Sequence, residues 1–257
     1  MREFAGFFLK QVRSSVFALF IFAMLAVSHW QHLLPRYDFM LLTCLGMQFC
    51  MVWSGLESKK ELVAVCAFHA VGLGLELFKV SQGSWIYPEF AFTKFLGVPL
   101  FSGFMYASVA SYVFQAYRVF DLEVSDMPNR ACLLLGVGLV YANFFTSRAI
   151  GDYRAAMIVG LALLLMQSSA RFTCADMRFR MRLPLAFGLI GFFVWVGENL
   201  CTYLGAWQYP HQRHGWQWVD PSKIGSWSMM VLVAFSLIWA WKEGPLDAPL
   251  NARTVSH

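Results

Sequence analysis

Long apolar runs alternate with short polar segments along almost the whole chain. Each run approaches the roughly 20 residues that cross a bilayer as a helix. The runs cover residues 15–33, 39–54, 62–79, 98–118, 130–146, 154–170, 184–204 and 224–241. This pattern predicts an all-α polytopic membrane protein with about eight transmembrane helices. A shorter amphipathic segment precedes the first run and predicts a helix on the membrane surface.

One polar pattern occurs twice, 122 residues apart. Residues 76–88 and 198–210 both read Glu, six residues, Gly-x-Trp-x-Tyr-Pro. The repeat divides the chain into two related four-helix units, residues 1–126 and 127–257. An even number of helices in each unit makes the two units parallel, related by an axis along the membrane normal. We therefore expect the two Glu-bearing helices to be neighbours, with both carboxyl groups inside the bundle.

Composition places the chain in the membrane class. Its residues are 58% hydrophobic and only 14% charged, whereas a soluble domain is about one quarter charged. The net charge of +5 requires no nucleic acid as a partner. The side with both termini carries 13 of the 20 Lys and Arg residues, so the positive-inside rule places both termini in the cytoplasm. The expected location is the bacterial inner (cytoplasmic) membrane, with the two repeated loops facing outward.

The acids of the repeat, Glu76 and Glu198, are the candidate catalytic residues. A charged side chain inside a span costs about 3 kcal/mol on insertion scales and is a functional hypothesis by default. A structural alternative pairs Glu76 with Lys79, one turn later, and bonds Glu198 to a helix end. Lys79 corresponds to Cys201 in the second copy, so this ion pair does not explain both acids.

Residues near the two acids are candidate substrate-binding groups. A histidine lies two turns before Glu76 on the same helical face, an asparagine follows Glu198, and each outward loop carries a Trp and a Tyr. For the aromatic residues the alternative is a belt at the level of the lipid headgroups, and for the histidine it is packing. The candidates are His69, Trp85, Tyr87, Asn199, Trp207 and Tyr209.

No metal ligand and no cofactor is assigned. The six cysteines show no Cys-x-x-Cys spacing and lie mostly in apolar runs, where Cys behaves as a small apolar residue. His29 and His32 end the first run, and His211 and His214 lie in the last outward loop. A metal site on these histidines and Glu76 is a lesser alternative, because His211 follows a proline in a loop.

Several segments together resemble the YoaT-like bacterial integral membrane family, a domain of unknown function. They are residues 36–39 (RYDF), 83–89 (GSWIYPE), 97–107 (GVPLFSGFMYA), 198–199 (EN), 206–210 (AWQYP) and 215–216 (GW). The resemblance covers most of the chain and implies a membrane protein without transferable catalytic residues. A fainter similarity, in Gly97-Val98-Pro99 after a Tyr-rich loop and in the intramembrane acids, is to membrane carotenoid hydratases and lycopene cyclases.

The leading interpretation is a membrane-embedded, acid-catalysed enzyme acting on an isoprenoid or another lipid. A buried carboxyl group can protonate a carbon–carbon double bond, and Trp and Tyr faces stabilise the resulting cation. The first alternative is a proton- or cation-coupled transporter of a small molecule, and the second is a non-catalytic membrane component. Membrane lipids are the expected partners. Substrate and oligomeric state stay open, a homo-oligomer included.

Overall fold

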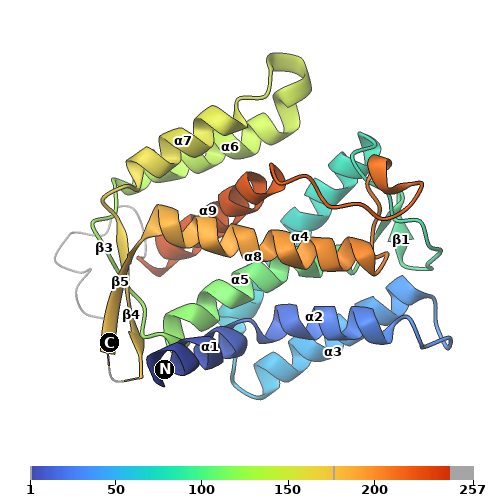
Figure 1. The fold of residues 1–257 in the computed structure, drawn as a ribbon, viewed down its shortest axis with the longest axis horizontal. Coiled ribbons are helices and arrows are strands. Elements are labelled where there is room, and N and C mark those ends of the chain that lie inside the picture. The colour runs from blue at the N-terminus through green and yellow to red at the C-terminus, as the bar shows by residue number, and fades with distance from the viewer. Residues whose placement is uncertain (1, 176, 244–257) are drawn as a thin grey trace.

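The computed structural model describes residues 2–175 and 177–243, and it is mostly helical (Figure 1). The helices are α1 (Arg2–Ser14), α2 (Val16–Val27), α3 (Arg36–Trp53), α4 (Lys59–Ser81), α5 (Ser102–Val119), α6 (Arg130–Ile150), α7 (Arg154–Leu164), α8 (Leu183–Tyr203), the 3-10 helix η1 (Pro210–Gln212) and α9 (Lys223–Lys242). The strands are β1 (Lys94–Phe95), β2 (Val98–Pro99), β3 (Glu123–Ser125), β4 (Ser169–Cys174) and β5 (Met177–Arg182). The predominance of helices agrees with the predicted all-α class, and the strands form two small additional sheets.

The two repeated loops meet at one end of the molecule. Ile86 and Gln208 form an antiparallel bridge, in which the backbone N–H of each residue donates to the carbonyl of the other at 3.0 and 2.9 Å. The three-stranded sheet and the beginning of α1 lie at the opposite end (Figure 1). The loops that the sequence predicts on the same side of the membrane are therefore in direct contact. We call them the outward loops, after the side that the sequence predicts for them.

Two helix pairs form the centre of the structure. Helix α4 packs on α5, α8 packs on α9, and α5 also contacts α9. The bounds of α8 and α9 follow those of α4 and α5 at a spacing of 122 residues, to within two residues at each end. Helices α4 and α8 themselves share few contacts. The expectation that the Glu-bearing helices are direct neighbours is wrong, because α5 and α9 make the central contact.

Four of the helices in the described residues, α4, α6, α8 and α9, are long and apolar enough to cross a membrane. A fifth span results if α1 and α2, which are bent by 70° at their junction, are counted together. The prediction of about eight spans is thus not reproduced in full. Helix α7 has only 11 residues, and α3 and α5 are long enough but carry too many polar side chains to qualify.

The segment after α7 differs from the sequence prediction. The sixth expected helix, residues 154–170, ends at Leu164, and the hydrophilic stretch 177–182, which lies between the sixth and seventh apolar runs, is strand β5. Strands β3, β4 and β5 form an antiparallel sheet. Arg178, Arg180 and Arg182 alternate along β5, so they lie on one face of the sheet, and all three are exposed. Alternation with period two, rather than polarity, is the signal of this strand.

Helix α1 is amphipathic, as its sequence predicts. Phe4 and Phe8 are 75% and 60% exposed, whereas Phe7 packs its ring against Phe120 and Phe172. The bend between α1 and α2 directs α1 away from the line of α2. One apolar face of α1 is thus anchored on the bundle while a second is free to contact lipid.

The bridge between the loops gives a direct test of this arrangement. Replacing Ile86 and Gln208 together with cysteine should produce a disulfide under mild oxidation, because residues opposed in an antiparallel pair have Cβ atoms about 4.5–5.5 Å apart. The measurement is the mobility shift on non-reducing gels, in a background with the exposed cysteines Cys50, Cys66 and Cys132 changed to serine. Combining the same Ile86 change with His214→Cys is the matched control. Equal cross-linking of both pairs would contradict the bridge.

Candidate functional site

Glu76 lies in the last two turns of α4 and is almost completely buried, with 3% exposure. Its Oε2 atom accepts hydrogen bonds from Trp85 Nε1 and Tyr87 Oη, both at 2.8 Å. Its Oε1 atom accepts from Tyr106 Oη on α5 at 2.8 Å. Three aromatic donors, two from the outward loop and one from the adjacent helix, therefore surround this carboxyl group.

Glu198 occupies the equivalent place on α8 and is 5% exposed. Tyr209 Oη donates to its Oε1 atom at 2.6 Å, and Trp227 Nε1 donates to its Oε2 atom at 2.7 Å. Tyr209 comes from the outward loop and Trp227 from α9. Both acids are thus held by donors from the loop that follows their helix and from the next helix.

The surroundings of the two acids are joined into one cluster. The rings of Trp85 and Tyr209 meet in an edge-to-face contact with centroids 5.8 Å apart. The Lys223 Nζ atom lies 5.6 Å from the Trp85 ring centroid and 5.0 Å from that of Tyr209, within range of a cation–π interaction. We call this group the acid cluster. It consists of Glu76, Trp85, Tyr87, Tyr106, Glu198, Tyr209, Lys223 and Trp227.

The donors around the acids are neutral groups. Burial raises the pKa of the Tyr87 phenol well above its usual value, and the neighbouring carboxyl of Glu76 adds to this effect. Burial and the carboxyl of Glu198 likewise raise the pKa of the Tyr209 phenol. Both phenols therefore keep their protons at physiological pH and can donate. A hydrogen bond to a charged group contributes about 1.5–3 kcal/mol, so these donors stabilise the carboxylate form.

The repeated motif encodes a specific helix ending. Gly83 and Gly205 have φ values of +68° and +72°, a conformation that glycine adopts without steric cost. After each glycine, the backbone N–H of the next residue donates to a carbonyl five residues earlier: Ser84 to Lys79 at 3.0 Å, and Ala206 to Cys201 at 2.9 Å. This is the Schellman pattern of helix termination. It turns the backbone back at the end of each helix, so that the tyrosine in the following loop reaches the acid of that same helix.

Arg36 connects the two outward loops from the beginning of α3. Its guanidinium donates to Glu89 Oε1 at 2.9 Å in the first loop and to the Leu204 carbonyl at 2.5 Å in the second. The adjacent Tyr37 donates from its hydroxyl to the Ala206 carbonyl at 3.0 Å. Arg36 is only 6% exposed and Tyr37 is fully buried, so these contacts fix the loops relative to each other and keep the acid cluster together.

The structure brings together some of the predicted substrate-binding residues. Trp85, Tyr87 and Tyr209 belong to the acid cluster through the contacts above. Trp207 is buried near it, at 6% exposure, but the indole that bonds Glu198 is that of Trp227. The two copies of the motif therefore share the Tyr–Glu hydrogen bond but differ in the source of the indole.

Two other predicted residues have structural contacts. Asn199 accepts from the Val219 backbone N–H at 2.9 Å and donates to the Trp195 carbonyl at 2.9 Å, so it anchors the second outward loop. The His69 ring meets that of Phe104 with centroids 4.4 Å apart, packed against α5 two turns from Glu76. The Glu76–Lys79 ion pair does not form; Lys79 Nζ lies 4.3 Å from the centroid of the Phe144 ring.

Sequence reasoning missed Lys223 and also the two hydrogen-bond donors from the neighbouring helices, Tyr106 and Trp227. They lie 30 and 29 residues after their respective acids, on helices that follow one another at the repeat spacing. The similar sequence separation between each acid and its donor was the signal that could have found these two residues. Because the residue types differ, a search for identical residues does not find it.

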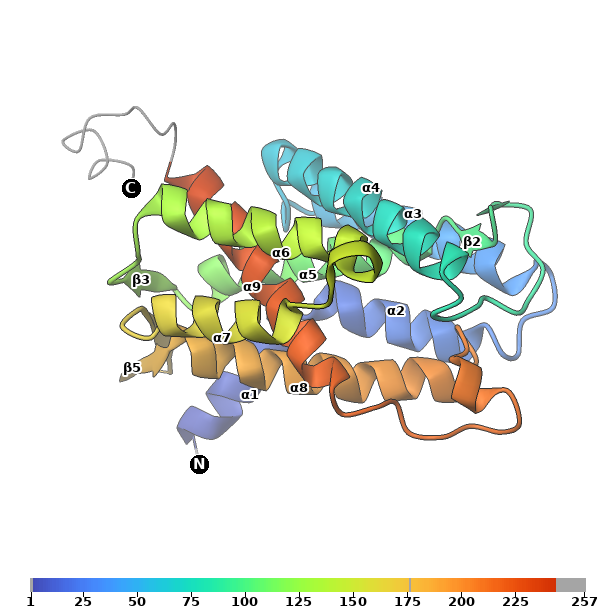
Figure 2. The ribbon, with the colours of Figure 1, turned by 90° about the horizontal axis from the view of Figure 1, so that it is seen from above.

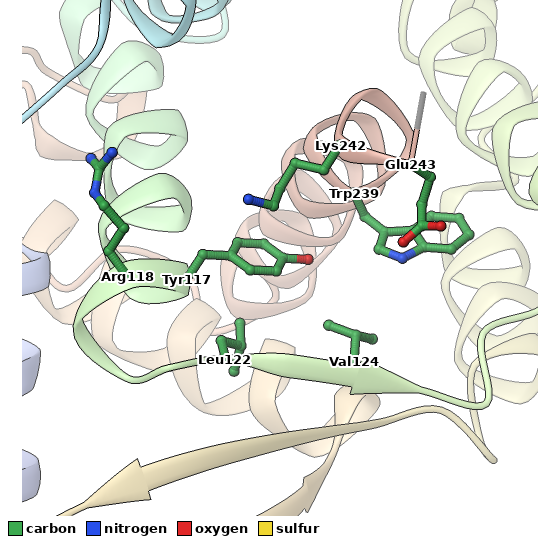
Figure 3. A pocket seen from close by; sticks show the side chains of 7 residues that line it. All are labelled: Tyr117, Arg118, Leu122, Val124, Trp239, Lys242 and Glu243. Atoms are coloured by element: carbon green, nitrogen blue, oxygen red, sulfur yellow. The ribbon is translucent and has the colours of Figure 1, made fainter. Parts of the chain in front are cut away.

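Two cavities in the described part of the chain lie away from the acid cluster. One, of about 300 Å³, opens between α5, α9 and strand β3 and is lined by Tyr117, Arg118, Lys242 and Glu243, among which the side chains of Tyr117 and Lys242 point toward its middle (Figure 3). The other, of about 530 Å³, lies beside the loop between α2 and α3 and includes His29 and His32. Within residues 2–175 and 177–243, no group of three or more His, Cys, Asp or Glu side chains is placed to hold a metal ion.

Comparison with known proteins places these features in a family. Residues 3–235 match the family described as "Protein of unknown function (DUF817)". The chain belongs to this family. It is also similar to the uncharacterized protein YoaT of Bacillus subtilis (strain 168), with 41% identity over 254 residues, which cover 98% of this chain and 96% of the relative. No solved structure matches. The resemblance found in the motifs is confirmed, and the acid cluster is a candidate site in a member of DUF817.

Close packing of α4 on α5 gives a stability test of the Glu76 environment. A Cβ atom added at Gly72 would lie 2.5 Å from the Tyr106 ring, whereas one added at Gly74 meets nothing within 4 Å. We expect Gly72→Ala to lower the free energy of unfolding by about 1–3 kcal/mol through overpacking, because it displaces the ring that bonds Glu76. Gly74→Ala is the matched control on the same helix. Thermal unfolding of both variants in detergent is the measurement, and equal stability of the two would contradict this packing.

Proposed function

We propose that the protein is a membrane-embedded enzyme that uses Glu76 and Glu198 for acid–base chemistry on an isoprenoid or another lipid. One observation carries the proposal: two buried carboxyl groups, placed alike on α4 and α8, join in one cluster with Trp and Tyr side chains. Carboxyl groups supply protons, and aromatic faces stabilise a carbocation. The cluster contains both requirements.

The reaction class follows from these groups. A protonated carboxyl gives its proton to one carbon of a substrate double bond, whose π electron pair forms the new C–H bond and leaves a cation on the other carbon. The carboxylate left behind is stabilised by the phenol and indole donors. The second carboxylate then takes a proton from a carbon next to the cation, and that C–H pair forms a new double bond. The sum is an isomerisation or, with ring closure between the steps, a cyclisation.

The membrane arrangement in this proposal has eight helices, α2–α9, in two parallel four-helix units, residues 1–126 and 127–257. The agreement of α4 with α8 and of α5 with α9 at the repeat spacing supports it. At 1.5 Å per residue, the 11 residues of α7 extend for only about 16 Å, so in this arrangement the residues that follow α7 complete the crossing between α6 and α8. Both termini lie in the cytoplasm, and the membrane is the bacterial inner membrane. Residues 244–257 of the second unit lie outside the described residues.

Proton- or cation-coupled transport is the second candidate, and Lys223 favours it. This ammonium group interacts electrostatically with both Glu198 and Glu76. Protonation of either acid would weaken the attraction and release Lys223, which is a plausible coupling step between proton binding and movement. Uptake in proteoliposomes that depends on a proton gradient would favour transport over catalysis.

Glutamine variants test the role of the acids. Glu76→Gln and Glu198→Gln keep the side-chain volume and one acceptor oxygen, replace the other oxygen with an NH2 donor that a tyrosine hydroxyl can accept, and remove the titratable proton. We expect each variant to accumulate normally in the membrane and to lose activity. The readout is the difference between membrane lipid extracts of strains that express the wild type, a variant or no protein, analysed by untargeted mass spectrometry. A shared site predicts that the double variant is little worse than either single one.

The control is another buried acid. Glu57, between α3 and α4, is 1% exposed and accepts hydrogen bonds from Gln48 and Ser111, outside the acid cluster. Glu57→Gln should keep activity. Glu76→Ala should lower folded yield, because it strands three buried donors at about 1–3 kcal/mol each. Wild-type lipid profiles in both single glutamine variants would exclude catalysis and proton coupling by these acids.

Reporter fusions test the orientation. Fusions after Gly83 and after Gly205 should both report the outside, and a fusion after Lys60 should report the cytoplasm, because the positive-inside rule predicts this orientation. The contact between the loops supports a common side for Gly83 and Gly205. The measurement uses paired reporters, one active on each side of the membrane. Opposite results at Gly83 and Gly205 would exclude the parallel arrangement.

A further inference from the structure

Basic side chains from four helices gather next to the acid cluster. Lys79 at the end of α4 interacts electrostatically with Arg148 on α6, Arg154 on α7 and Lys223 on α9. Lys223 also interacts with Arg154. The end of α4, the turn between α6 and α7, and the beginning of α9 lie in the same half of the molecule in both views (Figures 1 and 2). That half carries the outward loops.

Few acids balance these charges. Arg154 is paired with Asp152, with their closest N and O atoms 2.5 Å apart. The side-chain hydrogen bonds from Arg154, together with the nearby Lys79, lower the pKa of Asp152 to about 2. Among the described residues, no carboxylate lies within ion-pair distance of Lys79, Arg148 or Lys223. Three cationic groups thus stand without a direct counter-ion.

The contacts of these three groups leave donors free. Lys79 Nζ lies 4.3 Å from the Phe144 ring centroid, and Lys223 Nζ lies above the rings of Trp85 and Tyr209. Arg148 donates from Nη2 to the Gln82 carbonyl at 3.0 Å. Aromatic faces position an ammonium group without using its N–H donors fully. The cations are therefore held in place and still able to bind an anion.

We propose that Lys79, Arg148, Arg154 and Lys223 bind the phosphate group of the substrate, with its apolar chain directed to the acid cluster. This inference rests on the proposed function and names the substrate class: a phosphate-bearing lipid. A phosphate dianion matches several positive charges at once, and its oxygens accept from both ammonium and guanidinium groups. Lys223 belongs to both the basic group and the acid cluster, so a phosphate bound there places the attached chain beside Glu198 and Glu76.

Binding of two probes tests the site directly. The full-length protein in phosphatidylcholine nanodiscs is titrated at pH 7 with dodecyl phosphate and, separately, with inorganic phosphate, and the midpoint of thermal unfolding is followed. We expect dodecyl phosphate to raise the midpoint and added salt to weaken the effect. Binding of inorganic phosphate as well would show that the phosphate group is sufficient; binding of dodecyl phosphate alone would show that the chain is required. Both results support the site.

Charge-removing variants locate the binding. Lys79→Gln and Lys223→Gln should each weaken the apparent affinity about tenfold, because each removes a charge-assisted contact. Lys60→Gln, at the other end of α4, is the matched control and should bind as the wild type does. Gel filtration of each variant confirms that it is folded. Equal affinity of the wild type and the double Lys79→Gln, Lys223→Gln variant, or no effect of either probe on the wild type, would overturn the proposal.

The binding assay separates this inference from the proposed chemistry. The double variant Glu76→Gln, Glu198→Gln should bind dodecyl phosphate at least as tightly as the wild type, because it removes negative charge near Lys223. If it binds normally but the strain keeps its lipid profile, the acid chemistry is wrong and the phosphate site stands. If binding is absent while the glutamine variants lose activity, the phosphate site is wrong and the acid chemistry stands.

Discussion

The cost of burying a carboxyl group governs the half of this structure that contains the two repeated loops. An acid removed from water is tolerated only when its oxygens are bonded to donors or paired with charge. Glu76 and Glu198 meet this condition with neutral phenol and indole donors. To supply these donors the chain must terminate α4 and α8 sharply and turn back. The glycine in the left-handed conformation and the tyrosine four residues later are therefore parts of one requirement.

Residues at the beginning of α3 hold the two loops against each other. Arg36 and Tyr37 bond the loops directly. Asp38 accepts from the backbone N–H groups of Phe92 and Thr93, both at 2.9 Å. Three consecutive side chains thus fix loop backbone that would otherwise have no regular partner. Burying the guanidinium group of Arg36 costs desolvation, and its benefit here is that the two loops are held with Trp85 beside Tyr209.

The sequence predicts the helices well and the contacts between them less well. Continuous apolar runs locate the helices, because such runs need no information about neighbours. Strand β5 was missed, since its arginines at alternate positions resemble a polar loop when only polarity is considered. The repeat correctly identifies Glu76, Glu198, Trp85, Tyr87 and Tyr209 as one group of residues. Tyr106 and Trp227 could not be found in the same way, because different side chains perform the same hydrogen bonding in the two copies.

The unequal surroundings of the two acids bear on their chemistry. Glu76 accepts from three donors, whereas Glu198 accepts from two and has the ammonium group of Lys223 nearby. If the two copies of the motif had identical surroundings, their two carboxyl groups would have equal affinities for a proton. Different environments separate the affinities of two carboxyl groups, which allows one to act as the acid while the other acts as the base. In the proposed acid–base chemistry, the different indole donors, Trp85 and Trp227, and the presence of Lys223 in one half alone would make two similar acids unequal, as proton transfer in one direction requires.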